Sequence, residues 1–529
     1  MPGFFVENFG CRATQADGAA LERQFEEQGM VRASAAAHAS VVVLNTCTVT
    51  ASADQDARSA VRRVRRQNPQ AKIVVTGCYA QRAAEEIAAL PGVDLVIGNS
   101  HKHQLAEIVA VASSGVVAHR GGVADAGWRS AASAAPPSLP SKAAFAAGVS
   151  AFIPLASLSA SAGNRRPEAG SPIFVSDIFA HTELLAAPVF DASNQRTRPN
   201  LKVQDGCHNR CSFCVIPYVR GQSRSLGLDR TISEVKTLVA AGYREIVISG
   251  INLGRWGRDL ASSPADVAPA ALGCPGEQSL PGFALPASRK PRAGSQKPRI
   301  ADLIRAILAE TNLEKLRISS VEPMDWSDDL ISLVASSRRI AKHAHVPMQS
   351  GSDVVLRRMH RKYRPWHYRE KIEKIAAAMP DAAIGADVMV GFPGETDSEF
   401  EATRQLIEDL PFTYLHVFTY SARPGTPAAE MKNQVPVQVA RERNRRLRDL
   451  ASEKKLAFMR RFIGHTVEAI TLNVTASEAD GEFTETLTDN YLKLRLRGCH
   501  EANRWQMVNV ENVLNGALVG ALDLSQCGL

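Results

Sequence analysis

Residues 204–214 read Gln-Asp-Gly-Cys-His-Asn-Arg-Cys-Ser-Phe-Cys, and they overlap the end of a β-like run at residues 201–204, Leu-Lys-Val-Gln. The cysteines of this stretch, Cys207, Cys211 and Cys214, have the spacing C-x3-C-x2-C. Three thiolates on one short loop can hold three irons of a cubane cluster, which leaves the fourth iron open to another ligand. The spacing therefore favours a 4Fe-4S cluster with one open coordination position.

Zinc is the competing occupant of this loop. A zinc ion would need a fourth ligand, for which His208 and the distant Cys274 are candidates. Zinc modules, however, usually combine two C-x2-C pairs, and this loop contains a single one. The spacing favours the cluster over zinc, and also over three unrelated core cysteines.

Strand and helix patterns alternate on both sides of the cysteine loop. The β-like runs lie at residues 201–204, 245–249, 315–319, 344–347, 383–390 and 414–419. Strands that alternate with helices form parallel sheets, and this series is typical of an open or partial (β/α) barrel. We expect an α/β fold with a central domain at residues 196–430, interrupted by a low-complexity insertion at residues 262–297.

The N-terminal region, residues 1–112, shows the same alternation and predicts an open parallel sheet. Cys11, Cys47 and Cys78 each come just after the carboxyl end of a predicted strand, at the edge where open parallel sheets bind ligands. Taken singly, each cysteine is more often a buried apolar residue. The coincidence of three predicts a second three-thiolate cluster.

Two further regions complete the expected domain organisation. Residues 113–195 are rich in Ala, Ser and Pro and are predicted to form a linker or insertion. Residues 431–462 have a basic helical pattern and connect to residues 463–529, where short alternating strands predict a small β-barrel.

Composition narrows the protein class. The chain has 529 residues, 45% of them hydrophobic, and a net charge of +8, which excludes a wholly disordered or collagen-like protein. Nine cysteines, an odd number, argue for metal or reactive-thiol roles rather than a disulfide framework. The N-terminus lacks a secretory signal pattern, and the uncharged residues 143–163 are mostly Ala, Ser and Gly with Pro154 among them. We expect a cytoplasmic protein without a membrane partner.

Both cysteine patterns resemble those of a known family. The C-x3-C-x2-C loop is similar to the radical S-adenosylmethionine (SAM) motif, and the set of Cys11, Cys47 and Cys78 resembles the methylthiotransferase N-terminal domain. The last domain resembles the TRAM RNA-binding barrel. Together these features are similar to the radical SAM methylthiotransferases that act on tRNA or on a ribosomal protein.

Three segments resemble one branch of that family, which is specific for threonylcarbamoyladenosine. They are residues 45–50 (Asn-Thr-Cys-Thr-Val-Thr), residues 345–353 and residues 410–418. The isopentenyladenosine branch typically has Ser-Ile-Arg where this chain has Thr-Val-Thr at residues 48–50.

The resemblance implies two 4Fe-4S clusters and SAM as cofactors. The cluster on Cys207, Cys211 and Cys214 would chelate SAM and cleave it to a radical, and the second cluster would hold the sulfur to be inserted. Polar residues that follow the barrel strands would line the SAM pocket. These residues are Asn252, Ser319, Glu322, Gln349 and Asp387.

An RNA partner is expected from clustered positive charge and from the C-terminal domain. The candidate RNA-binding residues are Arg445, Arg446, Arg448, Asn490 and Tyr491. An alternative without RNA binding is that Arg445, Arg446 and Arg448 lie on a solvated helix face, where acidic residues such as Glu442 and Asp449 balance their charge. The segment that contains Asn490 and Tyr491 resembles a TRAM signature, in which aromatic and polar groups could engage RNA.

The function that the resemblance implies is radical SAM-dependent methylthiolation at C2 of N6-threonylcarbamoyladenosine, next to the anticodon of tRNA. One alternative keeps this chemistry but acts on isopentenyladenosine tRNA or on a ribosomal protein. A remote alternative is a non-catalytic, zinc-dependent RNA-binding protein. The expected partners are the tRNA anticodon arm and an electron donor that is flavodoxin-like or ferredoxin-like, whereas the sequence leaves the sulfur donor unknown.

Overall fold

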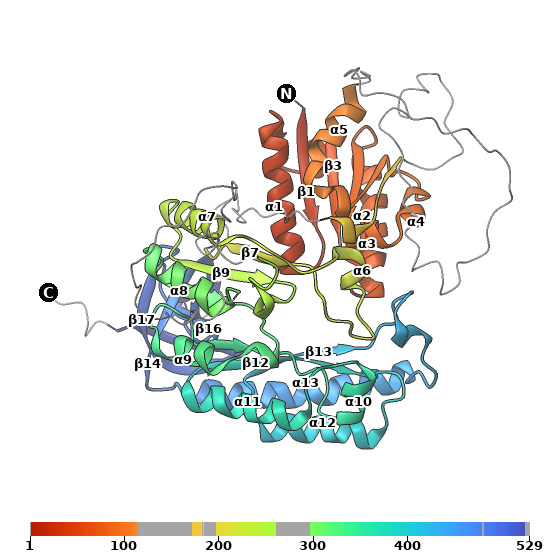
Figure 1. Ribbon diagram of the computed structural model, residues 1–529. Coiled ribbons are helices and arrows are strands. Elements are labelled where there is room, and N and C mark those ends of the chain that lie inside the picture. Colours follow the sequence, from red (N-terminus) through yellow and green to blue (C-terminus); the bar gives the residue numbers. More distant parts are fainter. Residues whose placement is uncertain are drawn as a thin grey trace, which may run out of the picture.

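The computed structural model describes residues 2–114, 172–181, 184, 197–260, 297–478 and 481–523. Most of the two predicted insertions, with Cys274 and Cys527, lies outside these residues. The described residues form an N-terminal parallel sheet, a central α/β domain and a small C-terminal barrel, so the predicted fold class is confirmed (Figure 1).

The N-terminal sheet has the strand order β2-β1-β3-β4-β5-β6, and all of its strands are parallel. Its strands are β1 (Gly3–Asn8), β2 (Val31–Arg32), β3 (Val41–Thr46), β4 (Lys72–Gly77), β5 (Leu95–Gly98) and β6 (Ile173–Phe174). Its helices are α1 (Arg12–Glu27), α2 (Ala51–Gln67), α3 (Cys78–Arg82), α4 (Ala84–Ala88) and α5 (Leu105–Ser114). Strand β6 comes from within the region predicted as a linker, and it adds an edge strand to this sheet.

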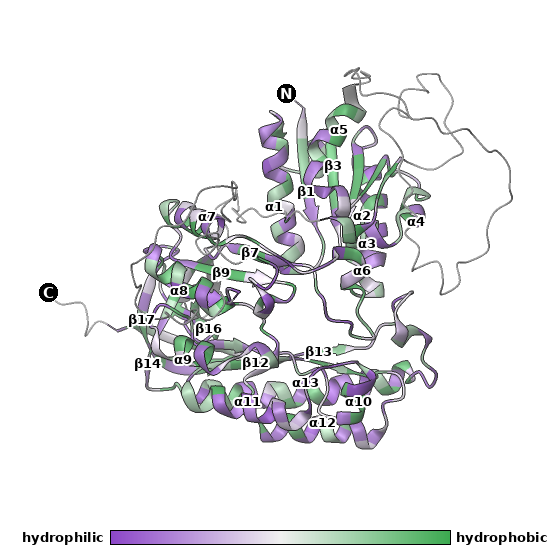
Figure 2. Cartoon of the chain, viewed as in Figure 1, coloured by the Kyte–Doolittle hydropathy of each residue, from purple (hydrophilic) through white to green (hydrophobic). Residues whose placement is uncertain are grey.

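Both faces of the N-terminal sheet are covered, because successive side chains of β3 point to opposite faces. Val42 and Leu44 pack with residues of α2 and α3, whereas Val41 and Val43 pack with residues of α1 and α5. A strand buried on both faces reads as a continuous apolar run, and residues 41–44 of β3 form such a run, which gives most of this strand the hydrophobic colour in Figure 2.

The central domain has two sheets that together form an open barrel wall; their strands are parallel except for the short β8, which pairs with β7 in the antiparallel direction. One has the order β10-β9-β7-β8, and the other has the order β11-β12-β13. Single bridges from Leu316 to Ile340 and from Ser320 to His345 connect them. The strands are β7 (Asn200–Asp205), β8 (Arg224–Ser225), β9 (Glu245–Gly250), β10 (Lys315–Ile318), β11 (His343–His345), β12 (Ala383–Val390) and β13 (Tyr414–Thr419).

Helices between these strands cover the outer side of the wall, except for the first of them, which packs against α3 of the N-terminal domain (Figure 1). They are α6 (Ile216–Arg220), α7 (Leu228–Ala240), α8 (Ile300–Glu310), α9 (Asp328–Ser336), α10 (Asp353–Arg358), α11 (Pro365–Ala378) and α12 (Asp397–Asp409). Helix α12 begins with a capping box, in which Thr396 and Glu399 each accept a backbone hydrogen bond from the other. One large apolar core lies between the wall and these helices.

A long helix, α13 (Val437–Arg460), leads to the C-terminal barrel. The barrel is closed in the order β14-β15-β16-β18-β17. Its strands are β14 (Thr466–Glu478), β15 (Gly481–Thr488), β16 (Lys493–Arg497), β17 (Trp505–Leu514) and β18 (Ala517–Leu522). Phe458 and Phe462, at the end of α13, belong to the barrel core, so the helix and the barrel pack as one unit.

Candidate functional site

A cavity of about 540 Å³ lies at the carboxyl edge of the central strands. All three cysteines of the C-x3-C-x2-C loop line it, and so does Cys11 of the N-terminal domain. The five residues that the resemblance assigned to SAM also line it, namely Asn252, Ser319, Glu322, Gln349 and Asp387. The fold thus brings the predicted SAM residues together with one complete cysteine set and one member of the other.

The cysteine loop begins at the end of β7 with a turn that requires glycine. Gly206 has a φ of +68°, and a Cβ atom there would lie 1.9 Å from the carbonyl oxygen of Gln222. At the middle of the loop, Ser212 donates a hydrogen bond of 2.7 Å to the carbonyl oxygen of Arg358. These contacts hold the backbone between the cysteines in a fixed conformation.

Polar hydrogens point at the sulfur atoms of this loop. The backbone amide of Asn209 and the side-chain amide of Asn252 lie 3.3 and 3.5 Å from Sγ of Cys207. The guanidinium group of Arg361 donates to Sγ of Cys211 at 3.4 Å and also pairs with Glu322. Hydrogen bonds to cysteine sulfurs stabilise negative charge there and tune the reduction potential of an iron–sulfur cluster.

The second cysteine set lies at the carboxyl edge of the N-terminal sheet, as predicted from strand order. Cys11 caps the N-terminus of α1, and Cys78 begins α3 directly after β4. Cys47 follows β3 and is 5% exposed, whereas Cys78 is 2% exposed and Cys11 is exposed. The two buried thiols therefore lie in the protein interior and Cys11 faces the cavity.

Burial changes the acidity of two of these thiols. Burial and the neighbouring Cys78 raise the pKa of Cys47 to about 12, and burial and Cys211 raise the pKa of Cys214 to about 12. A free thiolate is therefore disfavoured at both positions, and a bound metal cation would offset that cost.

In the described part of the chain, no three His, Cys, Asp or Glu side chains converge closely enough to hold one metal ion.

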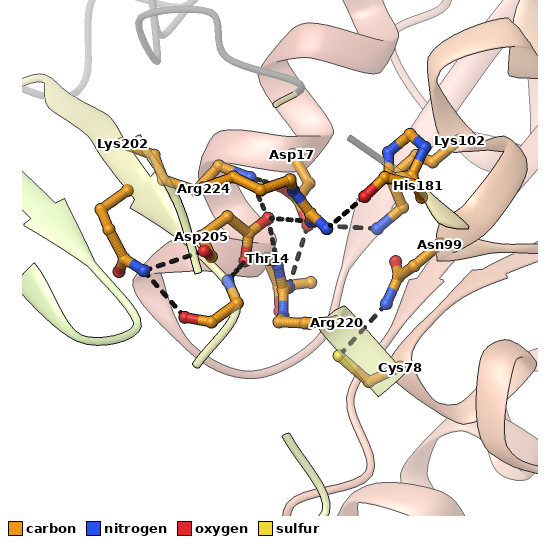
Figure 3. A network of polar contacts seen from close by, with 12 residues as sticks. Thr14, Asp17, Cys78, Asn99, Lys102, His181, Lys202, Asp205, Arg220 and Arg224 are labelled. Carbon is orange, nitrogen blue, oxygen red and sulfur yellow. Dashed lines mark hydrogen bonds and ion pairs between the residues drawn. The ribbon is translucent and has the colours of Figure 1, made fainter. Parts of the chain in front are cut away.

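A buried ionic network joins the two cysteine-bearing domains (Figure 3). At its centre, Arg220 of α6 donates to Asp17 of α1 at 2.9 Å and to Asp205 of β7 at 3.0 Å. Lys202 of β7 pairs with both carboxylates, and Lys102 pairs with Asp17. Burial alone would raise the pKa of Asp17, but the charges of Arg220, Lys102 and Lys202 hold it below its ordinary value.

Positive charge exceeds negative charge in this network. Besides Arg220 and the two lysines, Arg224 lies 3.9 Å from Asp205, so four basic side chains face two carboxylates. The network adjoins the N-terminal cysteine set, because Asn99 donates both to the carbonyl oxygen of Val219 and toward Sγ of Cys78. An excess of buried cations complements an anionic thiolate cluster, which supports the assignment of these cysteines.

The candidate RNA-binding residues have different environments. On α13, Arg445 pairs with Glu442 and Asp449, and Arg446 pairs with Glu401. Arg448 is exposed and has no ion pair among the described residues. Asn490 is buried and donates to the carbonyl oxygen of Asp381, whereas Tyr491 lines the cavity.

Several cavity residues were not predicted. The rings of His343, His345, Tyr414 and His416 line it, and so does the guanidinium group of Arg361. The histidines and Tyr414 occupy alternate positions of β11 and β13, so a period-two pattern of polar rings on two strands was the available signal. Arg361 lies in a turn after α10, where the sequence offers no such pattern.

None of the helices in the described ranges is long and apolar enough to cross a membrane.

Comparison with known proteins identifies both halves of the site. Residues 3–98 match the "Uncharacterized protein family UPF0004", and residues 201–407 match the radical SAM superfamily. These matches contain the N-terminal and the central cysteine sets, respectively.

Curated relatives align with most of the chain. The chain is 32% identical to the threonylcarbamoyladenosine tRNA methylthiotransferase MtaB of Bacillus subtilis, over 93% of this chain and 90% of that protein. It is 30% identical to MtaB of Aquifex aeolicus, over 94% of this chain and 97% of that protein. It is also 33% identical to the tRNA-2-methylthio-N(6)-dimethylallyladenosine synthase of Novosphingobium aromaticivorans, over 88% of this chain and 86% of that protein.

The matched domains and the whole-chain relatives imply a 4Fe-4S cluster that binds SAM and a second cluster on the N-terminal domain. With Cys11 and the three cysteines of the central loop at one cavity, these findings show that the chain belongs to the radical SAM methylthiotransferase family and is similar to MtaB.

Proposed function

We propose that this protein is a tRNA methylthiotransferase that acts at C2 of N6-threonylcarbamoyladenosine next to the anticodon. The observation that carries the proposal is the shared cavity, which Cys11 lines together with Cys207, Cys211 and Cys214. A reaction that both activates a C–H position and delivers sulfur needs two reactive centres close to one substrate atom. The names of the MtaB relatives support the choice of nucleoside.

The bound SAM and clusters would supply a deoxyadenosyl radical and the methylthio group. The protein's own residues bind and orient these groups. Asn252 and Arg361 orient the cysteine loop through their contacts with Cys207 and Cys211. Two buried polar atoms on the wall, Oδ1 of Asn252 and Oγ of Ser249, have no hydrogen-bond partner among the described residues and are available to SAM.

The remaining parts of the proposal concern partners and location. The C-terminal barrel, as a TRAM-like domain, would bind the anticodon arm together with exposed basic residues of α13 such as Arg448. A flavodoxin-like or ferredoxin-like protein would supply electrons. We infer a cytoplasmic location, because the proposed substrate is tRNA.

The test compares tRNA nucleosides by mass spectrometry, from a host that lacks this protein and from the same host supplied with it. We expect 2-methylthio-N6-threonylcarbamoyladenosine to appear, and to be absent when the host receives the Cys47→Ala variant. Methylthiolated isopentenyladenosine would instead assign the protein to the sister branch. If no methylthio nucleoside changes, tRNA is not the acceptor and a ribosomal protein becomes the substrate to examine.

A further inference from the structure

Five rings form a continuous wall of the cavity. They belong to His343, His345, Tyr414, His416 and Tyr491. The rings of His343 and Tyr414 are parallel within 6° at 5.9 Å, and the ring of Tyr491 lies 4.7 Å from His343 and 5.8 Å from Tyr414. Stacked rings of this kind bind the flat face of a nucleobase.

Burial keeps three of these rings neutral at physiological pH. Burial, and then the charge of Arg317, hold the pKa of His343 well below its ordinary value, and burial lowers the pKa of His416. Burial also raises the pKa of Tyr414, so its hydroxyl keeps its proton. These three rings can stack on a base and donate or accept hydrogen bonds, but they offer no charge to an anionic substituent.

The cavity lining contains two arginines, Arg12 and Arg361. The guanidinium group of Arg361 is occupied by Glu322 and Sγ of Cys211. Arg12 donates to the hydroxyl of Tyr491 at 3.2 Å, and it has no carboxylate partner among the described residues. Within the described lining, Arg12 is thus the cation available to an anionic ligand.

Arg12 also stands where a base substituent would reach it. It follows Cys11 directly, and its side chain contacts Tyr491, a member of the ring wall. A base stacked on the rings would therefore share the cavity with the cysteines of the central loop and with Arg12. Arginine binds carboxylates through two parallel hydrogen bonds, which makes it suited to a carboxylate at the end of a base substituent.

We propose that Arg12 binds the carboxylate of an adenine substituent while the ring wall holds the base. This inference rests on the proposed function, since the threonylcarbamoyl group carries a carboxylate and the isopentenyl group does not. Arg12 is then a specificity-determining residue, because it raises the affinity for the nucleoside with a carboxylate and does not raise the affinity for the one with an apolar substituent.

A phosphate of the RNA backbone is the other anion that could reach Arg12, and a double-mutant cycle separates the two. The reconstituted holoenzyme and its Arg12→Gln variant are titrated, without oxygen, with anticodon stem–loop RNA that carries either threonylcarbamoyladenosine or adenosine at the same position. Fluorescence anisotropy measures binding, and iron content verifies that both proteins hold their clusters.

We expect Arg12→Gln to weaken binding of the modified RNA about tenfold or more and to leave binding of the unmodified RNA unchanged. Arg12→Lys should restore part of the loss. The control is Arg62→Gln, which replaces an exposed arginine of α2 outside the cavity lining. This variant should leave the difference in affinity between the two RNAs unchanged.

Two results would overturn the inference. An equal loss for both RNAs would assign Arg12 to a phosphate, and no loss for either RNA would exclude it from anion binding. The proposed function is judged separately, by whether the wild-type holoenzyme forms the methylthio product on the modified RNA.

Discussion

Single residues control this site mainly through charge that is removed from water. Arg220 is 2% exposed and serves the carboxylates of two domains at once. Without Arg220, both buried carboxylates would keep their lysine partners but lose a charged hydrogen-bond donor that water cannot replace, so the effect of one substitution is large. The same guanidinium group on an exposed helix would contribute little.

Arg220→Gln should therefore lower the melting temperature of the protein by roughly 6–12 °C. Breaking a buried ion pair costs about 3 kcal/mol or more, and about 1 kcal/mol shifts the midpoint of a domain of this size by about 2–4 °C. Differential scanning calorimetry measures the shift. Arg445→Gln, which removes exposed ion pairs, is the control and should change the midpoint by less than about 3 °C. Equal shifts for both variants would mean that the network does not stabilise the domain interface.

His343 should make stability depend on pH near neutrality. The pKa of His343 in the folded protein lies below the ordinary value of 6.5. Just below pH 6.5, the unfolded chain therefore binds a proton at His343 and the folded chain does not. The contribution of neutral His343 to the free energy of unfolding is therefore fully present above pH 6.5 and declines as the pH falls below that value. The difference in melting temperature between wild type and His343→Gln should shrink from pH 7.5 to pH 5.5. A constant difference would contradict this, and His465→Gln, at an exposed position, is the control.

At the scale of elements, the carboxyl ends of parallel strands place the chemistry. The turn from β4 into α3 brings Cys78 to the sheet edge, and Gly77 makes this turn with a φ of +99°. A Cβ atom on Gly77 would lie 2.3 Å from the carbonyl oxygen of Thr46 on β3. The position of one cluster ligand thus depends on a close approach of two strands.

Gly77→Ala should abolish the N-terminal cluster and leave the other in place, so that iron falls from about eight to about four atoms per chain. Because β4 must move away from Thr46, Cys78 can no longer face Cys47. Gly29→Ala is a matched control, since Gly29 also has a positive φ, of +77°, but nothing lies within 4 Å of the added carbon. Iron analysis after anaerobic reconstitution measures the outcome. Full iron content in Gly77→Ala would refute this account of the turn.

At the scale of the whole molecule, the cavity exists because three domains meet. Cys11 and Arg12 come from the N-terminal domain, the SAM residues and most rings from the central domain, and Tyr491 from the barrel. Arg12 and Tyr491 are hydrogen-bonded although 479 positions separate them in the chain. RNA that the barrel binds near Tyr491 would therefore be held at the cavity that the reactive cysteines line.

Salt dependence should reveal which arginines of α13 contact RNA. The logarithm of the association constant for RNA falls linearly with the logarithm of salt concentration. Arg448→Gln should make this slope shallower by about one unit, since one phosphate contact is lost. Arg445→Gln should change it less, because acidic neighbours already pair with that guanidinium group. Binding titrations with unmodified tRNA at several salt concentrations measure both slopes. Identical slopes for wild type and Arg448→Gln would show that this face of α13 does not contact RNA phosphates.

Much of the fold could be predicted because its signals are local. The C-x3-C-x2-C spacing places three thiolates on one loop, and strand–helix alternation places Cys11, Cys47 and Cys78 at one sheet edge. Neither placement depends on how the domains pack against one another. The strand runs at residues 41–44 and 383–390 are long and apolar enough to be assigned without any partner.

The ring wall, the role of Arg12 and the Arg220 network depend on domain packing instead. Each joins residues that are far apart in the chain, such as Asp17 with Arg220 and Arg12 with Tyr491, and no spacing rule links such pairs. Their energies also arise from burial, because an ion pair or a histidine acquires its strength or its shifted pKa only when neighbouring domains exclude water. Local spacing determines which groups can bind metal, and tertiary packing determines which groups they meet.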